Sequence, residues 1–259
     1  MARKTAGREI FKTIIFCGVI IALLFGLKSL FPHTTKETKS TNTTTTKETV
    51  TAKLSTKTTK EDTDTYLIEI TNPVVLGLSD TIDKKINDDI VATSASIKKD
   101  FLDELADVKP DIGPGEKSTL SVDFNPEEKH LAHNILSLVL SVESYTNGAA
   151  HPNHYQKVLH YDVTTGNGVM LLDLFKDKNE AYSAVSKEAI KKLNALFVKE
   201  GTPDWFREGA APTAENYENF ILNADTLTII FNPYQVAAYV RGAVTIDIPL
   251  TAFSGKLIF

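Results

Sequence analysis

Two neighbouring runs decide the fold: 131-LAHNILSLVLSVESY-145 and 156-QKVLHYDV-163. Both are rich in Val, Ile, Leu and Tyr, the residues that favour strands. Between them lies Asn147-Gly148, a dipeptide typical of tight hairpin turns. The sequence therefore predicts a strand at 131–145 that turns back and pairs with a second strand at 156–163. This pairing favours an antiparallel sheet over a doubly wound parallel sheet.

Shorter strand patterns and two helical patterns surround this pair. A helix begins after Ser79, a residue that caps helices well, and stops before Lys109-Pro110. A second amphipathic helix covers 181–198. Further strands are expected at 66–70, 118–124, 169–174, 220–222, 226–231 and 243–248, and Asn72-Pro73 is expected to end the first of them. The fold class is α+β, with a mainly antiparallel sheet packed with two helices.

The composition is that of a globular protein, at 42% hydrophobic and 24% charged residues. A formal net charge of −5 argues against general nucleic-acid binding, which requires a basic face. A single cysteine, Cys17, excludes an internal disulfide framework and a cysteine-rich zinc fold.

The N-terminal part predicts a membrane anchor. Residues 13–31 are mostly apolar, carry Lys28 as their single charge, and are long enough to cross a bilayer. Four basic residues precede them: Arg3, Lys4, Arg8 and Lys12. The positive-inside rule then leaves 1–12 in the cytoplasm and the rest outside, in a single-pass cell-membrane protein. A cleaved signal peptide is the alternative, but no small-residue cleavage site follows the apolar run.

Residues 32–65 are dominated by Thr, Lys and Glu. Such a segment buries too little apolar surface to offset its ordering entropy, so we expect a disordered spacer. The folded part then begins at residue 66 and divides into units at 66–146 and 147–259.

Several motifs in the folded part resemble those of a bacterial cell-envelope family. In the N-terminal unit these are Asn72-Pro73-Val74-Val75 and the helix containing Asn87. In the C-terminal unit they are 147-NGAAHPN-153, His160-Tyr161-Asp162, Thr165-Gly166, 172-LDLF-175, 231-FNPYQVA-237 with Gly242, and Ile248-Pro249. These motifs are similar to the paired DUF4163 and DUF3298 domains of RsiV-like ectodomains.

The resemblance implies an extracytoplasmic binding or sensing module. Family members include the lysozyme-binding ectodomain of an anti-sigma factor and a non-catalytic region of peptidoglycan deacetylases. We expect residues 1–12 to be too short for a sigma-binding module, and we expect no catalytic domain after the second unit. The expected ligand is therefore a cell-wall component or a wall-degrading protein such as lysozyme, with no enzymatic activity, cofactor or metal.

The candidate binding residues lie on two loops. His151, Asn153 and His154 belong to the first, and the loop at 201–216 carries Trp205, Phe206 and Arg207. Trp and Arg are favoured binding anchors when exposed. Other motif residues are expected to have a structural role in turns and packing: Tyr161, Asp162, Gly166, Pro233, Tyr234 and Gly242.

Two other functions remain open from the sequence. His151, His154 and His160, with Asp162, supply ligand types suited to zinc, so a metal-assisted envelope hydrolase is one alternative. A purely architectural envelope protein is the other.

Overall fold

The computed structural model describes residues 51–108, 116–197 and 206–259, which belong to one compact unit. The predicted cytoplasmic tail, the predicted span at 13–31 and residues 32–50 of the predicted spacer lie outside this part of the chain. Among the described helices, none combines the length and the apolar character that a bilayer crossing requires.

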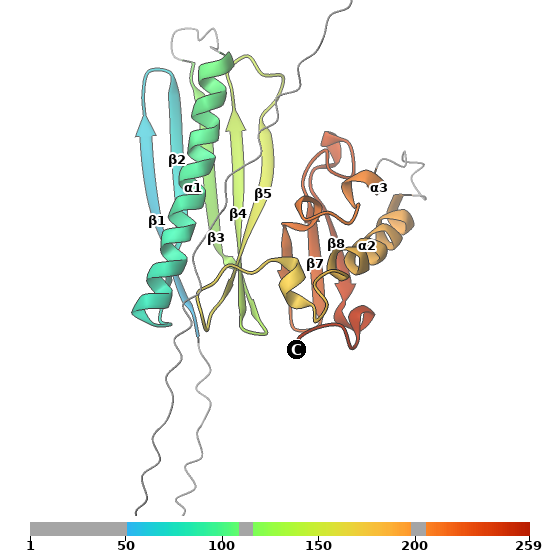
Figure 1. The fold of residues 1–259 in the computed structure, drawn as a ribbon. Helices are drawn as coiled ribbons and strands as arrows, with labels where there is room; N and C mark the ends of the chain where they lie inside the picture. The colour runs from blue at the N-terminus through green and yellow to red at the C-terminus, as the bar shows by residue number, and fades with distance from the viewer. Residues whose placement is uncertain (1–50, 109–115, 198–205) are drawn as a thin grey trace, which may run out of the picture. The chain divides into compact units, whose positions relative to one another are not determined.

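A five-stranded sheet forms the centre of the N-terminal part (Figure 1). Its strands, in spatial and chain order, are β1 (Lys53–Asp62), β2 (Tyr66–Leu76), β3 (Ser118–Ala132), β4 (Ile135–Tyr145) and β5 (Asn153–Asp162). Only β2 and β3 pair in parallel; the other pairs are antiparallel. Since β4 and β5 pair along ten residues on each strand, the predicted boundary at residue 147 divides this sheet.

Strand β1 corrects the expectation of a spacer up to residue 65. It pairs with β2 along its whole length, although almost all of its side chains are exposed. The backbone hydrogen bonds of β1 form whether or not its side chains alternate between apolar and polar. Its lysines are typical of edge strands, where charge discourages pairing with another chain.

Strand β2 corrects a second expectation, because it continues through Pro73 to Leu76. Its pairing with β3 ends at Ile70, whereas its pairing with β1 goes on. At Pro73 the strand therefore carries one ladder only, which is where a residue without an N–H is tolerated.

Helix α1 (Asp80–Val108) lies across one face of this sheet (Figure 1). Ser79 Oγ accepts a hydrogen bond from the Ile82 N–H and caps the helix as expected. Ile86, Ile90 and Phe101 are buried against alternate residues of the sheet. The Asn87 side chain bonds both the N–H and the C=O of Val75, at 2.8 Å each, which attaches the helix to β2.

The C-terminal part forms a second layer around a three-stranded antiparallel sheet. Its strands are β6 (Phe220–Leu222), β7 (Thr226–Phe231) and β8 (Val244–Pro249), in that order. The helices are α2 (Ala181–Phe197) and α3 (Phe206–Gly209), with 3₁₀ turns η1 (Leu171–Leu174), η3 (Glu215–Tyr217), η4 (Tyr239–Arg241) and η5 (Leu250–Phe253). The strand predicted at 169–174 is therefore wrong: its last four residues form η1, whose Leu171 and Leu174 enter the core beside α2.

Candidate binding cleft

The two sheets meet on the face of the large sheet opposite α1, which we call the cleft face. Four buried apolar residues form a cluster at this contact: Val139, Val158, Ile221 and Ile230. One step further along β4 and β5, the residues on the same face are Ser141 and Gln156. A cleft of about 760 Å³ lies beyond this step, between the polar part of the cleft face and the β7–β8 loop. Its volume is within the range of small-ligand sites.

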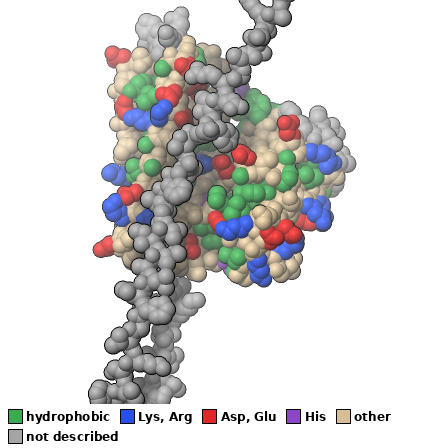
Figure 2. Space-filling view, viewed as in Figure 1, with side chains coloured by type: hydrophobic (Ala, Val, Ile, Leu, Met, Phe, Trp, Pro, Cys, Tyr) green, Lys and Arg blue, Asp and Glu red, His purple; other side chains and the backbone are tan. Residues whose placement is uncertain are grey.

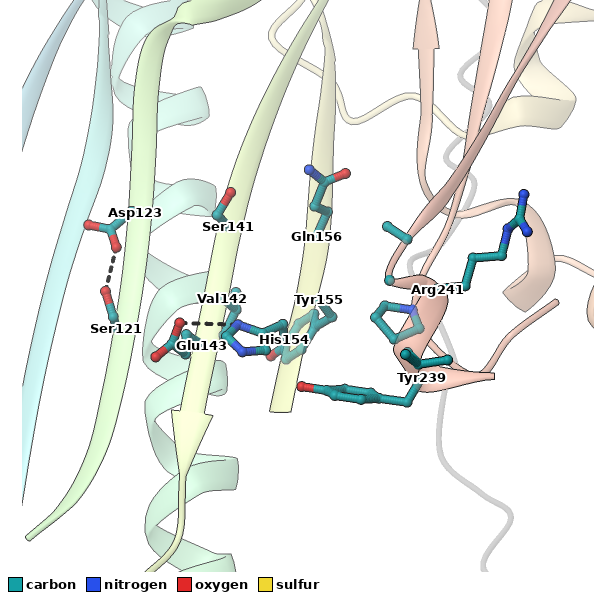
Figure 3. Close-up of a pocket in the computed structure, with 14 residues that line it drawn as sticks. Ser121, Asp123, Ser141, Val142, Glu143, His154, Tyr155, Gln156, Tyr239 and Arg241 are labelled. Carbon is teal, nitrogen blue, oxygen red and sulfur yellow. Dashed lines mark hydrogen bonds and ion pairs between the residues drawn. The ribbon is translucent and has the colours of Figure 1, made fainter. Parts of the chain in front are cut away.

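Six polar side chains form the floor of the cleft, in two rows that cross β3, β4 and β5 (Figure 3). Residues paired across antiparallel strands point to the same face, so the strand register sets both rows. The first row is Ser121, Glu143 and His154, and the second is Asp123, Ser141 and Gln156.

Two pairings hold the carboxylates of the floor. His154 Nδ1 lies 3.1 Å from Glu143 Oε2, and the Ser121 hydroxyl donates a hydrogen bond to Asp123. A carboxylate has two oxygens and about four acceptor positions. The floor therefore offers acceptors from Asp123 and Glu143, hydroxyls from the serines and an amide from Gln156, all on rigid strands.

The wall of the cleft comes from the 232–243 loop and includes Tyr239, which belongs to an aromatic cluster with His151 and Tyr234. The Tyr239 hydroxyl donates to the carbonyl of Pro152 at 2.5 Å, and its ring stacks on His151 with centroids 4.1 Å apart. The Tyr234 ring lies 5.3 Å from that of Tyr239. The loops at 147–154 and 232–243, which the sequence singled out separately, thus meet beside the cleft.

The 232–243 loop owes its shape to a tight turn. Gln235 N donates to Asn232 O at 3.0 Å, Pro233 occupies the second position and Tyr234 has a φ of 69°. This is the pattern of a type II turn, whose third position requires positive φ. The turn directs Tyr234 outward, where 58% of it is exposed, and Val240 at the rim is 94% exposed. Arg241 points away from the floor, with its guanidinium 5.0 Å from the Phe197 ring (Figure 3).

The second layer is fixed to the outer edge of β5 by asparagine side chains. Asn232 Oδ1 accepts from Gln156 N at 2.8 Å, and Asn232 Nδ2 donates to Gln156 O at 2.9 Å. Asn219 Oδ1 accepts from Val158 N at 2.9 Å. These amides take the place of a neighbouring strand and cover an edge that would otherwise be open.

His160 continues the same edge in a buried position. Its Nε2 bonds the carbonyl of Phe220 at 2.5 Å, and its ring stacks on the Phe220 ring at 3.7 Å. Burial lowers the pKa of His160 from 6.5 to about 4, and the charge of Lys157 lowers it slightly more, against the opposing effect of the Phe220 carbonyl. The side chain is therefore neutral at physiological pH.

The structure places the predicted binding residues in three different settings. His154 lines the cleft, His151 stacks on Tyr239 beside it, and Asn153 is exposed at the start of β5. Phe206 is only 1% exposed, so its prediction as a surface anchor is wrong: it fills the core beside Phe197.

Arg207 is exposed, and its guanidinium lies 5.2 Å from the centre of the Phe206 ring. Trp205 lies outside the described residues. The 206–216 part of that loop does not line the cleft; Glu208, Gly209 and Asn216 line a separate, smaller pocket.

The motif residues Tyr161, Asp162 and Gly166 shape the contact between β5 and α1. The buried Tyr161 hydroxyl donates to Asp89 Oδ2 at 2.8 Å, and burial raises its pKa. Asp162 Oδ1 accepts from the N–H of Thr164 at 2.7 Å. Gly166 has a φ of 68°, and a Cβ there would lie 3.3 Å from Ile82 Cγ2. A glycine lets this turn approach the helix.

The zinc site that the sequence left open as an alternative does not form among the described residues. His160 is turned into the contact with Phe220, six residues along β5 from His154. Asp162 is engaged by its own turn, through Thr164. Within the described ranges, no three His, Cys, Asp or Glu side chains converge as metal ligands.

Comparisons with known proteins find a family model that resembles part of the C-terminal layer. Residues 172–251 match the family described as "Protein of unknown function (DUF3298)". A Bacillus subtilis protein named peptidoglycan-N-acetylmuramic acid deacetylase PdaC is 27% identical over 133 residues, which are 51% of this chain and 28% of that protein. The chain thus matches less than a third of that relative's length.

Solved structures resemble the fold. A DUF3298 family member from Bacteroides fragilis superposes with a TM-score of 0.59 at 17% identity, over 80% of this chain and 93% of that one. A DUF3298 protein from Pseudomonas aeruginosa gives a TM-score of 0.49 at 16% identity, over 80% and 94%. The first shows that a similar fold occurs in another protein, over most of this chain.

Proposed function

We propose that this chain is an extracytoplasmic binding module of the cell envelope and that the cleft holds a glycan component of the cell wall. The observation that carries the proposal is the lining of the cleft: carboxylates, hydroxyls and an amide on a rigid floor, with Tyr239 beside them. Polar groups of this kind fix the hydroxyls of a ligand, and an aromatic ring covers its apolar face.

Two further facts support the envelope setting. The name of the Bacillus subtilis relative refers to a peptidoglycan sugar. The sequence motifs also lead us to expect an ectodomain similar to the DUF4163 and RsiV-like ones. A single-pass anchor at 13–31 and a tether would hold the cleft outside the membrane. The module binds rather than hydrolyses, and it needs no cofactor.

Calorimetric titration of the full-length protein with soluble peptidoglycan fragments tests this function. Wild type should bind saturably, and Tyr239→Ala should weaken the affinity about tenfold or more, since aromatic anchors dominate binding sites. Tyr182→Ala is the matched control, because Tyr182 is a partly buried tyrosine of α2 that does not line the cleft. Saturable binding that is equal in all three proteins would place the ligand elsewhere, and absence of binding would refute the function.

A protein ligand such as lysozyme is the second candidate. The observation that favours it is the exposed apolar rim: Val240 at 94% and Tyr234 at 58% exposure. Large exposed side chains next to a cleft are typical of contact sites. Titration with lysozyme should then give saturable heat that Val240→Asp abolishes, whereas the glycan candidate predicts no such heat.

A further inference from the structure

The polar rows of the cleft floor do not stop at β3. The first row continues in register over β2 to β1. On the same face, Thr71 of β2 and Thr58 of β1 extend the second row just beyond the last β2–β3 pair, Ile70 with Val122. The first row, read from β1 to β5, is Lys60, Glu69, Ser121, Glu143 and His154. The second row contains Thr58, Thr71, Asp123, Ser141 and Gln156.

The rows are open to solvent along their length. Lys60, Glu69 and Thr58 are exposed, and no described element packs over this half of the cleft face. The row residues on β1 and β2 interact with each other rather than with a covering layer. The Thr58 and Thr71 hydroxyls lie 3.0 Å apart, and Lys60 Nζ lies 4.0 Å from Glu69 Oε2.

We propose that the cleft is the closed end of a longer binding platform, and that a chain of uncharged, hydroxyl-rich sugars lies across the strands from Tyr239 to β1. This inference rests on the proposed function and extends it from a single sugar site to a glycan strand. Strands are spaced about 4.8 Å apart, so five strands give a platform about 20 Å wide. That width accommodates several sugar units, whereas the cleft alone takes one or two.

The charge and polarity of the two rows indicate which class of ligand the platform binds. The two rows carry three carboxylates, on Glu69, Asp123 and Glu143, against the single ammonium of Lys60. An anionic polymer would be repelled by this excess. None of the ten side chains is apolar, which disfavours a hydrophobic peptide. Hydroxyl, amide and carboxylate groups pair well with sugar hydroxyls.

A length series tests the platform. We would titrate the full-length protein with N-acetylglucosamine oligomers, from the disaccharide to the hexasaccharide. The hexasaccharide should bind about tenfold more tightly than the disaccharide, which is ~1.4 kcal/mol. Polyglycerol phosphate, an anionic chain, should bind more weakly than either. Equal affinities for the short and long sugars, or tighter binding of the anionic chain, would overturn the proposal.

Variants at the far end of the platform provide the second test. The pair Glu69→Gln and Thr71→Val keeps the size of both side chains and removes one charge and one hydroxyl. It should reduce hexasaccharide affinity to that of the disaccharide while leaving disaccharide affinity unchanged. Lys57→Ala is the control, because Lys57 is on β1 but lines a groove with Ser94 and Lys98 of α1.

The outcomes separate the platform from the proposed function. Disaccharide binding that Tyr239→Ala weakens, with no effect of length or of the distal pair, would refute the platform alone. Failure of every oligomer and of peptidoglycan fragments to bind would refute both.

Discussion

Acidification should destabilise this protein through His160. The folded state holds the imidazole with a pKa of about 4, against 6.5 for the ordinary group. Between these values the unfolded chain binds a proton that the folded state does not bind. The free energy of unfolding is therefore fully retained above pH 6.5 and decreases as the pH falls toward 4.

The size of the effect follows from the same two values. Each unit of pKa difference corresponds to ~1.4 kcal/mol, so the complete linkage is about 3 kcal/mol. At about pH 5 most of the unfolded chains and few of the folded ones carry the proton, and about 2 kcal/mol has been lost. With a urea m-value of ~2 kcal/mol/M, the midpoint of unfolding should fall by about 1 M.

Urea unfolding at about pH 7.5 and about pH 5, followed by circular dichroism, measures this loss in wild type and in His160→Gln. Glutamine does not titrate, and it retains an N–H donor for the Phe220 carbonyl, which His160 bonds at 2.5 Å. Other titrating groups are present in both proteins, so the difference between the two shifts isolates His160. Identical shifts in the two proteins would refute the reasoning.

Two further substitutions test how the second layer is assembled. Gly209→Ala should cost more than ~3 kcal/mol in thermal unfolding, since a Cβ there would lie 1.7 Å from the Gln235 carbonyl oxygen. Gly148→Ala, at a φ of 88° with no atom within 4 Å, should cost only ~1–2 kcal/mol; equal costs would show that the close approach is unimportant. Asn232→Ala removes two hydrogen bonds to Gln156 and should cost about 2 kcal/mol, with faster hydrogen exchange at the Gln156 amide. Unchanged exchange there would mean that the asparagine does not protect the β5 edge.

Much of the α+β fold follows from apolar periodicity. The long helix and strands β4 to β8 stand out because their buried residues recur with the correct period. Strand β1 was missed because Thr58, Lys60 and their neighbours carry no apolar alternation: this edge strand is stabilised by backbone pairing with β2. The turn η1 was mistaken for a strand because Leu171 and Leu174 are apolar in either conformation.

The residues of the candidate cleft were only partly predictable. The sequence drew attention to His151 and His154 because they lie beside the conspicuous Asn147-Gly148 turn, and the structure places His154 in the lining of the cleft. Glu143 and Asp123 were missed because alternate polar residues on a strand usually mark a solvated face. Phe206 was misjudged because the sequence does not show whether an aromatic side chain in a loop is buried or exposed.

The position of the cleft depends on a single step in the strand register. On the cleft face, Val139 and Val158 pair with each other beneath the small sheet, and the next pair along the strands is Ser141 and Gln156. Apolar residues at this next pair would favour a longer contact between the sheets and would fill the cleft. The polar pair therefore ends the hydrophobic contact, and Asn232, bonded to the backbone of Gln156, fixes the wall at the same residue. Gln156 therefore has two effects: its backbone joins the two layers through Asn232, and its polar side chain keeps the cleft open.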